Sequence, residues 1–157
     1  MRTYRRIDHH RDGLPPRAEE AGRGKRHPSR DVMDVTRYIL AGLEIFIALN
    51  AVAGAVYGLG GAPSVPREWL AESPFTSFRI PSLVLLIAVG GSMFLAAALL
   101  LADVSIAPAV SLVAGVVLVA WILTQVAMIG YRMWLQPATF AAGLAVIALT
   151  ACVWVLQ

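Results

Sequence analysis

The sequence carries very little charge after its first 37 residues. From Tyr38 onward it contains seven charged residues, no histidine and one cysteine, Cys152. A lone cysteine excludes an intramolecular disulfide, and the adjacent pair His9 and His10 lacks the i, i+4 spacing of a helical metal site. The apolar part also lacks a carboxylate pair, a serine with a nearby histidine and a glycine-rich phosphate loop. We therefore predict no metal site, no cofactor, no catalytic residue and no enzymatic activity.

Apolar residues are unusually frequent in the sequence. Hydrophobic residues make up 58% of the 157 positions and the mean hydropathy is +0.69, whereas soluble domains contain roughly 45–50% apolar residues. Four long apolar runs cover about 38–60, 80–102, 106–129 and 137–156. Each run reaches the roughly 20 residues that a helix needs to cross a bilayer. The sequence therefore predicts an all-α fold, a four-helix transmembrane bundle formed by residues 36–157.

Residues 1–35 form a basic segment that is rich in arginine, glycine and proline. A segment with so few consecutive apolar residues cannot bury enough surface to offset the entropy of ordering, so we expect a disordered tail. Ten basic and six acidic residues up to Arg37 give this part a net charge of +4. No nucleic-acid-binding signature accompanies the charge, so we expect the tail to act at the lipid bilayer and to bind no nucleic acid. Met33, just before the first run, is an alternative start.

The basic residues also predict an orientation in the membrane. Lysine and arginine near span ends are retained on the cytoplasmic side, and ten of the thirteen precede the first span. We expect a multi-pass protein of the bacterial cytoplasmic (inner) membrane, with the N-terminus and the C-terminus both cytoplasmic. The loop 61–79, with a short helix at 66–72, then lies outside. Three arginines on the predicted outer side oppose this rule but are outnumbered by the tail.

Glu44 is the one ionisable residue inside a predicted span. Such a group costs at least a few kcal/mol unless it is paired, neutralised or hydrated, which makes it a candidate functional residue. On a helical projection it lies in a stripe of small residues that includes Ala41 and Ala48, a pattern typical of closely packed membrane helices. We expect Glu44 to point into the bundle, with Arg37 within partial reach. Its role is structural, or alternatively it handles a proton or cation or contacts a ligand.

A second polar layer is predicted nearer the outer side of the membrane. Gln125 lies about 10 Å outward of mid-span, and Glu44 lies roughly 18 Å away from it in depth, so the two cannot form one site. A ligand pocket is therefore expected to open toward the outer leaflet, although interhelical hydrogen bonds alone also explain these residues. The candidate ligand-binding residues of this layer are Asn50, Tyr57, Arg79, Gln125 and Gln136.

Short motifs along the spans support a resemblance to known proteins. They are Leu43-Glu44-Ile45, Ser73-Pro74-Phe75 leading to Ile80-Pro81, Gly90-Gly91, Trp121-Ile122 with Gln125, and Trp134-Leu135-Gln136-Pro137. On these motifs, about three-quarters of the chain resembles a widespread group of uncharacterised small bacterial four-helix integral membrane proteins. The resemblance implies a stand-alone bacterial membrane protein and no particular activity. A weaker likeness to DoxX-like proteins rests on span number and size.

Three functions are compatible with these features. The first is a non-enzymatic protein that packs with itself or with a membrane partner protein, or holds a lipid-like molecule between its helices. The second is a small proton- or ion-coupled carrier or channel that uses Glu44, which would require a dimer because four spans are few. The third, an accessory of quinone or thiol redox chemistry, is implied by the DoxX-like resemblance alone.

Overall fold

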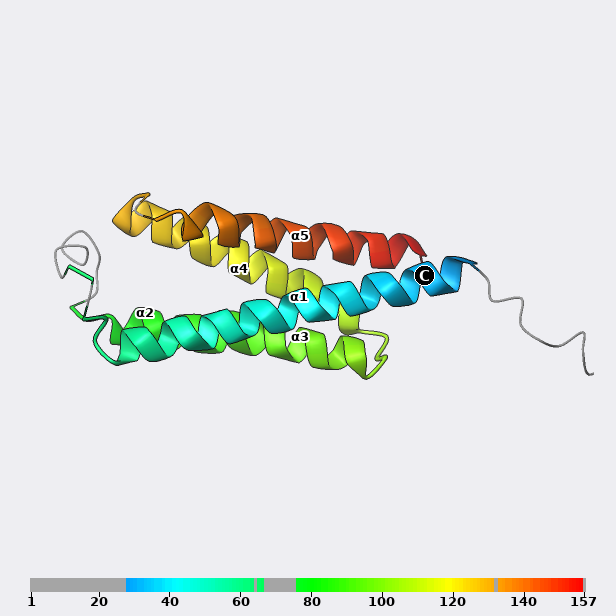
Figure 1. Cartoon of the computed structure of the whole chain (residues 1–157), viewed down its shortest axis with the longest axis horizontal. Coiled ribbons are helices and arrows are strands. Elements are labelled where there is room, and N and C mark those ends of the chain that lie inside the picture. Colours follow the sequence, from blue (N-terminus) through cyan, green and yellow to red (C-terminus); the bar gives the residue numbers. More distant parts are fainter. Residues whose placement is uncertain (1–27, 64, 67–75, 132, 157) are drawn as a thin grey trace, which may run out of the picture.

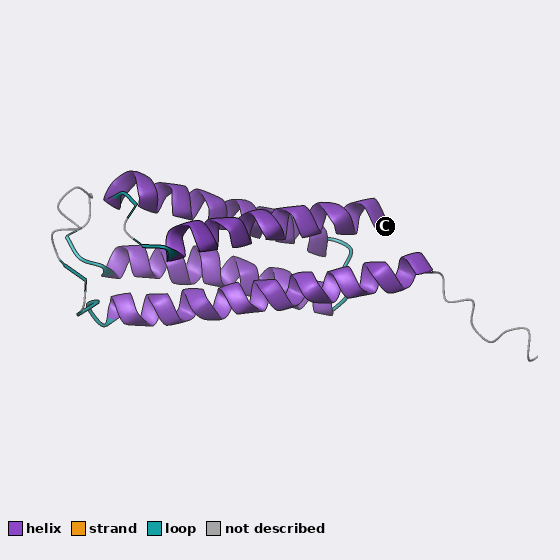
Figure 2. Ribbon diagram, turned by 45° about the horizontal axis from the view of Figure 1, so that its top comes forward, coloured by secondary structure: helices purple, strands orange, loops and turns teal. Residues whose placement is uncertain are grey.

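The protein consists of long apolar helices that run side by side (Figures 1 and 2). The computed structural model describes residues 28–63, 65–66, 76–131 and 133–156. Its helices are α1 (Pro28–Leu59), α2 (Arg79–Val84), the π-helical segment η2 (Leu85–Gly91), α3 (Ser92–Leu101), α4 (Ala107–Ile129) and α5 (Leu135–Leu156). Within this described part, four helical spans are long and apolar enough to cross a membrane. The predicted all-α, four-helix membrane fold is therefore confirmed.

The first helix begins earlier than the sequence predicts. Residues 28–35 are helical, so the prediction of disorder is wrong for this stretch, while residues 1–27 lie outside the described part. Pro28 suits the first helical position because its φ is fixed and it has no N–H to leave unpaired. Asp31 in the first turn interacts favourably with the positive end of the helix dipole. As a result, α1 extends past the C-terminal end of α5 (Figure 1).

The second span contains a π-helical segment that hydropathy does not predict. Arg79 to Leu101 forms one apolar helical stretch, in agreement with the predicted span, but residues 85–91 adopt the wider π geometry. The third and fourth spans begin and end within two residues of their predicted bounds. The short helix expected at 66–72 lies outside the described residues, apart from its first position.

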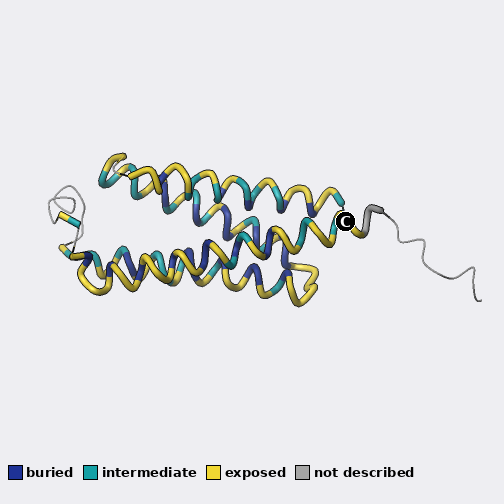
Figure 3. Tube along the Cα trace, in the orientation of Figure 1, coloured by how far each residue is buried: buried dark blue, intermediate teal, exposed yellow. Residues whose placement is uncertain are grey.

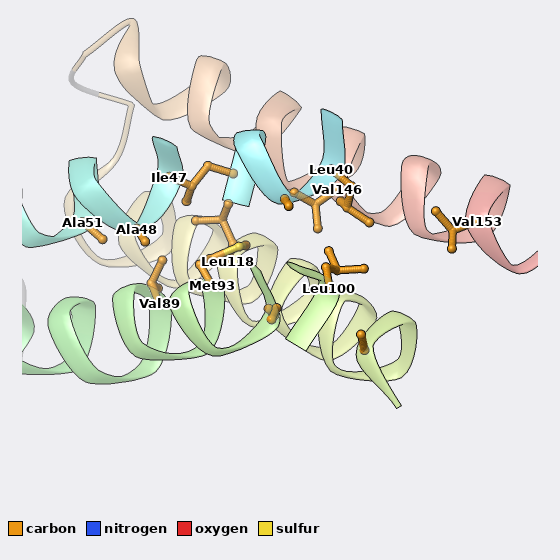
Figure 4. Close-up of a cluster of buried hydrophobic side chains, with 14 of the residues drawn as sticks. Leu40, Ile47, Ala48, Ala51, Val89, Met93, Leu100, Leu118, Val146 and Val153 are labelled. Atoms are coloured by element: carbon orange, nitrogen blue, oxygen red, sulfur yellow. The ribbon is translucent and has the colours of Figure 1, made fainter. Parts of the chain in front are cut away.

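The four spans surround the bundle axis in chain order. α1 packs against the second span, the second span against α4, α4 against α5, and α5 against α1 again. This order places α1 and α4 on a diagonal of the bundle. Buried residues face the axis and exposed residues face outward along every helix (Figure 3). The core includes Leu40, Met93, Leu118 and Val146, which meet between the helices (Figure 4).

The outward surface of the bundle is as apolar as its core. Large apolar side chains such as Ile87, Phe94 and Val113 are 59–70% exposed. Extended apolar exposure of this kind is rare on soluble monomers but is required of helices that contact lipid tails. The surface therefore agrees with four membrane-crossing helices.

One end of the bundle is fixed by the turn between α3 and α4. Asp103 adopts a left-handed conformation with φ of 56° after the last turn of α3. The N–H of Val104 donates to the Leu99 carbonyl oxygen at 3.1 Å, which satisfies a carbonyl at the helix end. The Asp103 carboxylate forms an ion pair with Arg37 of α1. The beginning of α1, this turn and the C-terminus consequently lie at the same end of the molecule (Figure 1).

Candidate ligand-binding cleft

A cleft of about 430 Å³ lies between α1, α4 and α5, in the half of the bundle where α1 ends and α5 begins. Its floor consists of buried apolar side chains that include Ile47, Val89 and Leu118. Its rim includes Phe46 and Trp134, which are 63% and 72% exposed. Because Phe46 lies well inside the length of α1 and is exposed, the cleft opens sideways there, toward the position that lipid tails occupy around a membrane protein.

Small residues on facing helices create the space. Ala51 on α1 and both Ala138 and Ala142 on α5 line the cleft, so their helices meet across it with little side-chain volume. On the second span, η2 contributes Leu85 and Val89 to the wall. The α4–α5 pair diverges from the pair formed by α1 and the second span toward this end of the molecule (Figure 1). The cleft thus follows from small side chains placed where the helices diverge.

Asn50, Gln125 and Thr139 place neutral polar side chains in the apolar lining, and the buried indole N–H of Trp121, which also lines the cleft, has no hydrogen-bond partner among the described residues. Asn50 of α1 donates a hydrogen bond from Nδ2 to the Phe46 carbonyl oxygen at 2.7 Å, and Thr139 of α5 donates from Oγ1 to the Leu135 carbonyl oxygen at 2.8 Å. Gln125 of α4 is half-buried in the wall. Each of the three retains free hydrogen-bonding capacity, because an amide and a hydroxyl both have several donor or acceptor positions.

A smaller cavity of about 170 Å³ adjoins the cleft and shares Gln125 and Thr139 with it. Gln136, which is buried, closes one side of this cavity. Its Nε2 donates to the Gly130 carbonyl oxygen at 3.2 Å, and its Oε1 accepts from the Met133 N–H at 3.4 Å. Gln136 therefore holds the turn between α4 and α5, which supports the polar end of the cleft.

The structure divides the predicted outer polar layer into two groups. Asn50 and Gln125 line the cleft, and Gln136 lies in the adjoining cavity. Tyr57 and Arg79 line neither space; Tyr57 is 44% exposed near the end of α1, and Arg79 is exposed at the first position of α2. Sequence reasoning placed Asn50 near mid-depth and the other four residues nearer the outer side, but depth does not determine which side of a helix faces its neighbours.

Glu44 lies apart from both cavities, in the interior of the bundle. Its side chain is fully buried and faces the hydroxyl of Ser111 on α4, across the diagonal. Neither carboxyl oxygen of Glu44 forms a hydrogen bond of good geometry with a described residue, and the Ser111 hydroxyl forms none either. Arg37, expected to reach toward Glu44, is paired with Asp103 instead. Glu44 thus points into the bundle as predicted, but without a cation beside it among these residues.

Ser111 is the residue of this polar pair that sequence reasoning missed. It is fully buried and lies on the same face of α4 as the buried Ala114, Gly115 and Leu118, at helical spacings of three, four and seven. A helical projection of the third span would have placed this hydroxyl on the interior face. Because a serine in an apolar span costs little when it bonds its own helix, composition alone gave no reason to select it.

Comparisons with known proteins supply no function for this arrangement. No protein-family model, no curated protein and no solved structure matches the chain. The functional argument therefore depends on the chemistry and the position of the cleft.

Proposed function

We propose that this is a non-enzymatic membrane protein that holds a lipid-like molecule in the cleft between α1, α4 and α5. The observation that carries the proposal is the cleft itself, an apolar space that opens sideways and bears a few polar groups. Ligand pockets typically enclose about 300–1,000 Å³ and combine apolar walls with a small number of polar groups. A cleft of about 430 Å³ with apolar walls and neutral polar groups fits an amphipathic ligand.

The arrangement of the helix ends supports an assignment to the outer leaflet. The start of α1 and the α3–α4 turn share one end of the bundle, while the cleft lies toward the other end. We propose that the end bearing the basic tail is cytoplasmic, in the inner membrane of a bacterium, because ten of thirteen basic residues precede or begin the first span. The cleft then belongs to the outer half of the bilayer.

The carrier alternative requires a path by which an ion or proton reaches Glu44. The Glu44 side chain is fully buried and lines neither the cleft nor the adjoining cavity. The position of the accessible space therefore favours ligand binding over ion coupling. A role in redox chemistry has no support from the cleft beyond its capacity to hold a lipid-like molecule.

The proposal is tested by filling the cleft from its apolar end. Ala142 lines the cleft, whereas its neighbour Ala141 is exposed on the same helix and does not. The variants Ala142→Phe and Ala141→Phe thus add the same volume at adjacent positions, one inside the cleft and one toward lipid. The measurement is the amount of lipid bound per protein after purification in mild detergent, determined by mass spectrometry of the intact protein.

We expect the wild type and Ala141→Phe to retain the same bound molecule and Ala142→Phe to lose it, because the phenyl ring occupies its space. The apparent melting temperature of all three proteins shows whether the variants are folded. Equal lipid content in folded wild type and folded Ala142→Phe, or a wild type that retains no lipid, would contradict the proposal.

A further inference from the structure

We infer that the cleft selects lipids whose polar group is uncharged and forms hydrogen bonds, such as the hydroxyl and ester groups of a diacylglycerol, through the amides of Asn50 and Gln125. This inference rests on the proposed function, because it names the chemistry of the ligand in the same cleft. It follows from four features of the lining: an amide that forms no hydrogen bond with the described residues, a second amide on the opposite helix, the lack of charge among the described lining residues, and the position of Gln125 relative to the apolar end.

Gln125 is the first of these features. Within the part of the chain that the structure describes, its amide forms no hydrogen bond, although it lies in a membrane-crossing helix and is half-buried. At that depth in a bilayer, water is not available to replace a missing partner, so an unpaired amide is costly. A ligand with a hydroxyl or carbonyl group would supply the missing partner.

Asn50 provides a second amide from the other side of the cleft. Its Nδ2 is held by the Phe46 carbonyl oxygen at 2.7 Å, which fixes the side chain along α1. Its Oδ1 accepts no hydrogen bond from any residue that the structure describes, and Asn50 and Gln125 both line the cleft. The two amides therefore offer donors and an acceptor from α1 and α4, which suits a ligand group that both donates and accepts.

The lining also lacks a charge that would favour an ionic headgroup. The described residues around the cleft include no Asp, Glu, Lys, Arg or His. An ion buried without a counter-ion in apolar surroundings is strongly disfavoured, whereas a neutral polar group needs its hydrogen bonds and nothing more. Amides consequently discriminate in favour of hydroxyl and carbonyl groups over a phosphate.

The positions of the polar and apolar residues give the ligand a direction. Gln125 and Thr139 lie toward the end where α4 finishes and α5 starts, and they also border the adjoining cavity. Ile47, Leu118 and Ala142 line the cleft nearer the middle of their helices. A lipid would therefore place its polar group toward the outer surface and its chains toward the midplane, as lipids of the outer leaflet do.

Three lipids with identical dioleoyl chains test the inference. Dioleoylglycerol carries a free hydroxyl, its O-methyl ether keeps the shape but cannot donate, and dioleoylphosphatidic acid adds a phosphate. Each is titrated against the full-length protein in detergent, and binding is measured by mass spectrometry of the intact complex. The variants are Gln125→Leu and Asn50→Leu, and Thr124→Leu is the control. Thr124 is exposed on α4, and its hydroxyl donates to the Ala120 carbonyl oxygen of the same helix.

For the wild type and Thr124→Leu, we expect dioleoylglycerol to bind more tightly than either of the other two lipids. Gln125→Leu and Asn50→Leu should each weaken dioleoylglycerol binding by about 3- to 10-fold, the effect of one hydrogen bond. Gln125→Leu should also bind dioleoylglycerol and its O-methyl ether with more similar affinities than the wild type does. Tighter binding of phosphatidic acid by the wild type, or unchanged affinity in both amide variants, would overturn the inference.

The filled variant Ala142→Phe separates this inference from the proposed function. If Ala142→Phe loses all three lipids while the amide variants leave the order of affinities unchanged, the cleft binds lipid but does not discriminate between lipids by their polar groups. If Ala142→Phe binds the lipids as the wild type does, the cleft is not the binding site and both proposals fail.

Discussion

At the scale of single residues, Glu44 is the most unusual feature of the bundle. Its carboxyl group is fully buried and faces Ser111, yet neither side chain forms a hydrogen bond of good geometry with any described residue. Buried polar atoms without partners reduce stability, and replacing them with an apolar group of similar shape is often neutral or stabilising. Among the described residues, Ser111 is thus the polar neighbour of Glu44, and no hydrogen bond of good geometry joins the two that an apolar side chain would break.

We therefore expect Glu44→Met to unfold in detergent at the same temperature as the wild type or higher, with a gain of up to about 1–2 kcal/mol. Glu44→Gln, which keeps the shape and loses the ability to ionise, should fold normally. Ion leak through liposomes should be equal for the wild type and Glu44→Gln. A Glu44→Met protein that is strongly destabilised, or a leak that Glu44→Gln abolishes, would show that the carboxyl group has a partner or a transport role.

The sequence identifies the polar residues of the spans but not which of them meet. Asn50 and Gln125 can be selected because amides in apolar runs are rare, and both line the cleft. Tyr57 and Arg79 are also polar residues near the predicted outer side, yet they line no cavity described above. The difference arises from helix rotation and divergence, which depend on the packing of all four spans and are not encoded in the depth of one residue.

At the scale of helices, the α4–α5 contact depends on two glycines. A methyl group at Gly115 would lie 2.9 Å from Ile147 Cγ1 and 3.1 Å from Val146 Cγ1, and one at Gly143 would lie 2.9 Å from Val119 Cγ2. These neighbours are β-branched and have one strongly preferred rotamer in a helix, so they cannot turn away. Close approach through small residues is the usual basis of helix association in membranes.

Gly115→Ala and Gly143→Ala should each lower the free energy of unfolding by about 1–3 kcal/mol, because the added methyl overpacks the interface. Gly42→Ala is the matched control: no atom lies within 4 Å of a methyl group at this position in α1. That variant should be stabilised by about 0.5–1 kcal/mol, as expected for glycine to alanine in a helix interior. The measurement is unfolding in detergent, and equal losses at all three positions would contradict this account of the α4–α5 contact.

Helix positions are the part of the fold that the sequence predicts best. Long apolar runs define the spans because a backbone in lipid must pair its own polar groups, and the helix closes those bonds locally. The prediction failed in two places: before the first span, where this constraint is absent, and in the second span, where a π-helix also pairs its own backbone groups. Residues 28–35 precede the first apolar run and are nevertheless helical. The second apolar run has the same hydropathy and the same number of residues whether positions 85–91 form an α-helix or a π-helix.

At the scale of the whole molecule, the function proposed here depends on how the bundle sits in the membrane. The four spans form a ring, and the cleft lies between α1, α4 and α5 at the end away from the ion pair of Arg37 with Asp103. The charge distribution supports the proposed orientation, and the small residues Ala51, Ala138 and Ala142 leave the space for the cleft. The sequence predicts a pocket near the outer leaflet but not the helix divergence that forms it.

The most direct test of the account is cysteine labelling of its loops in intact cells. In a Cys152→Ala background, single cysteines replace Pro63 and Tyr131 at the end near the cleft, and Ser105 in the α3–α4 turn; all three are exposed. A membrane-impermeant maleimide should label the first two positions in intact cells and Ser105→Cys only after permeabilisation. Labelling of Ser105→Cys in intact cells, with or without the other two, would contradict a four-span bundle whose cleft faces the outer leaflet.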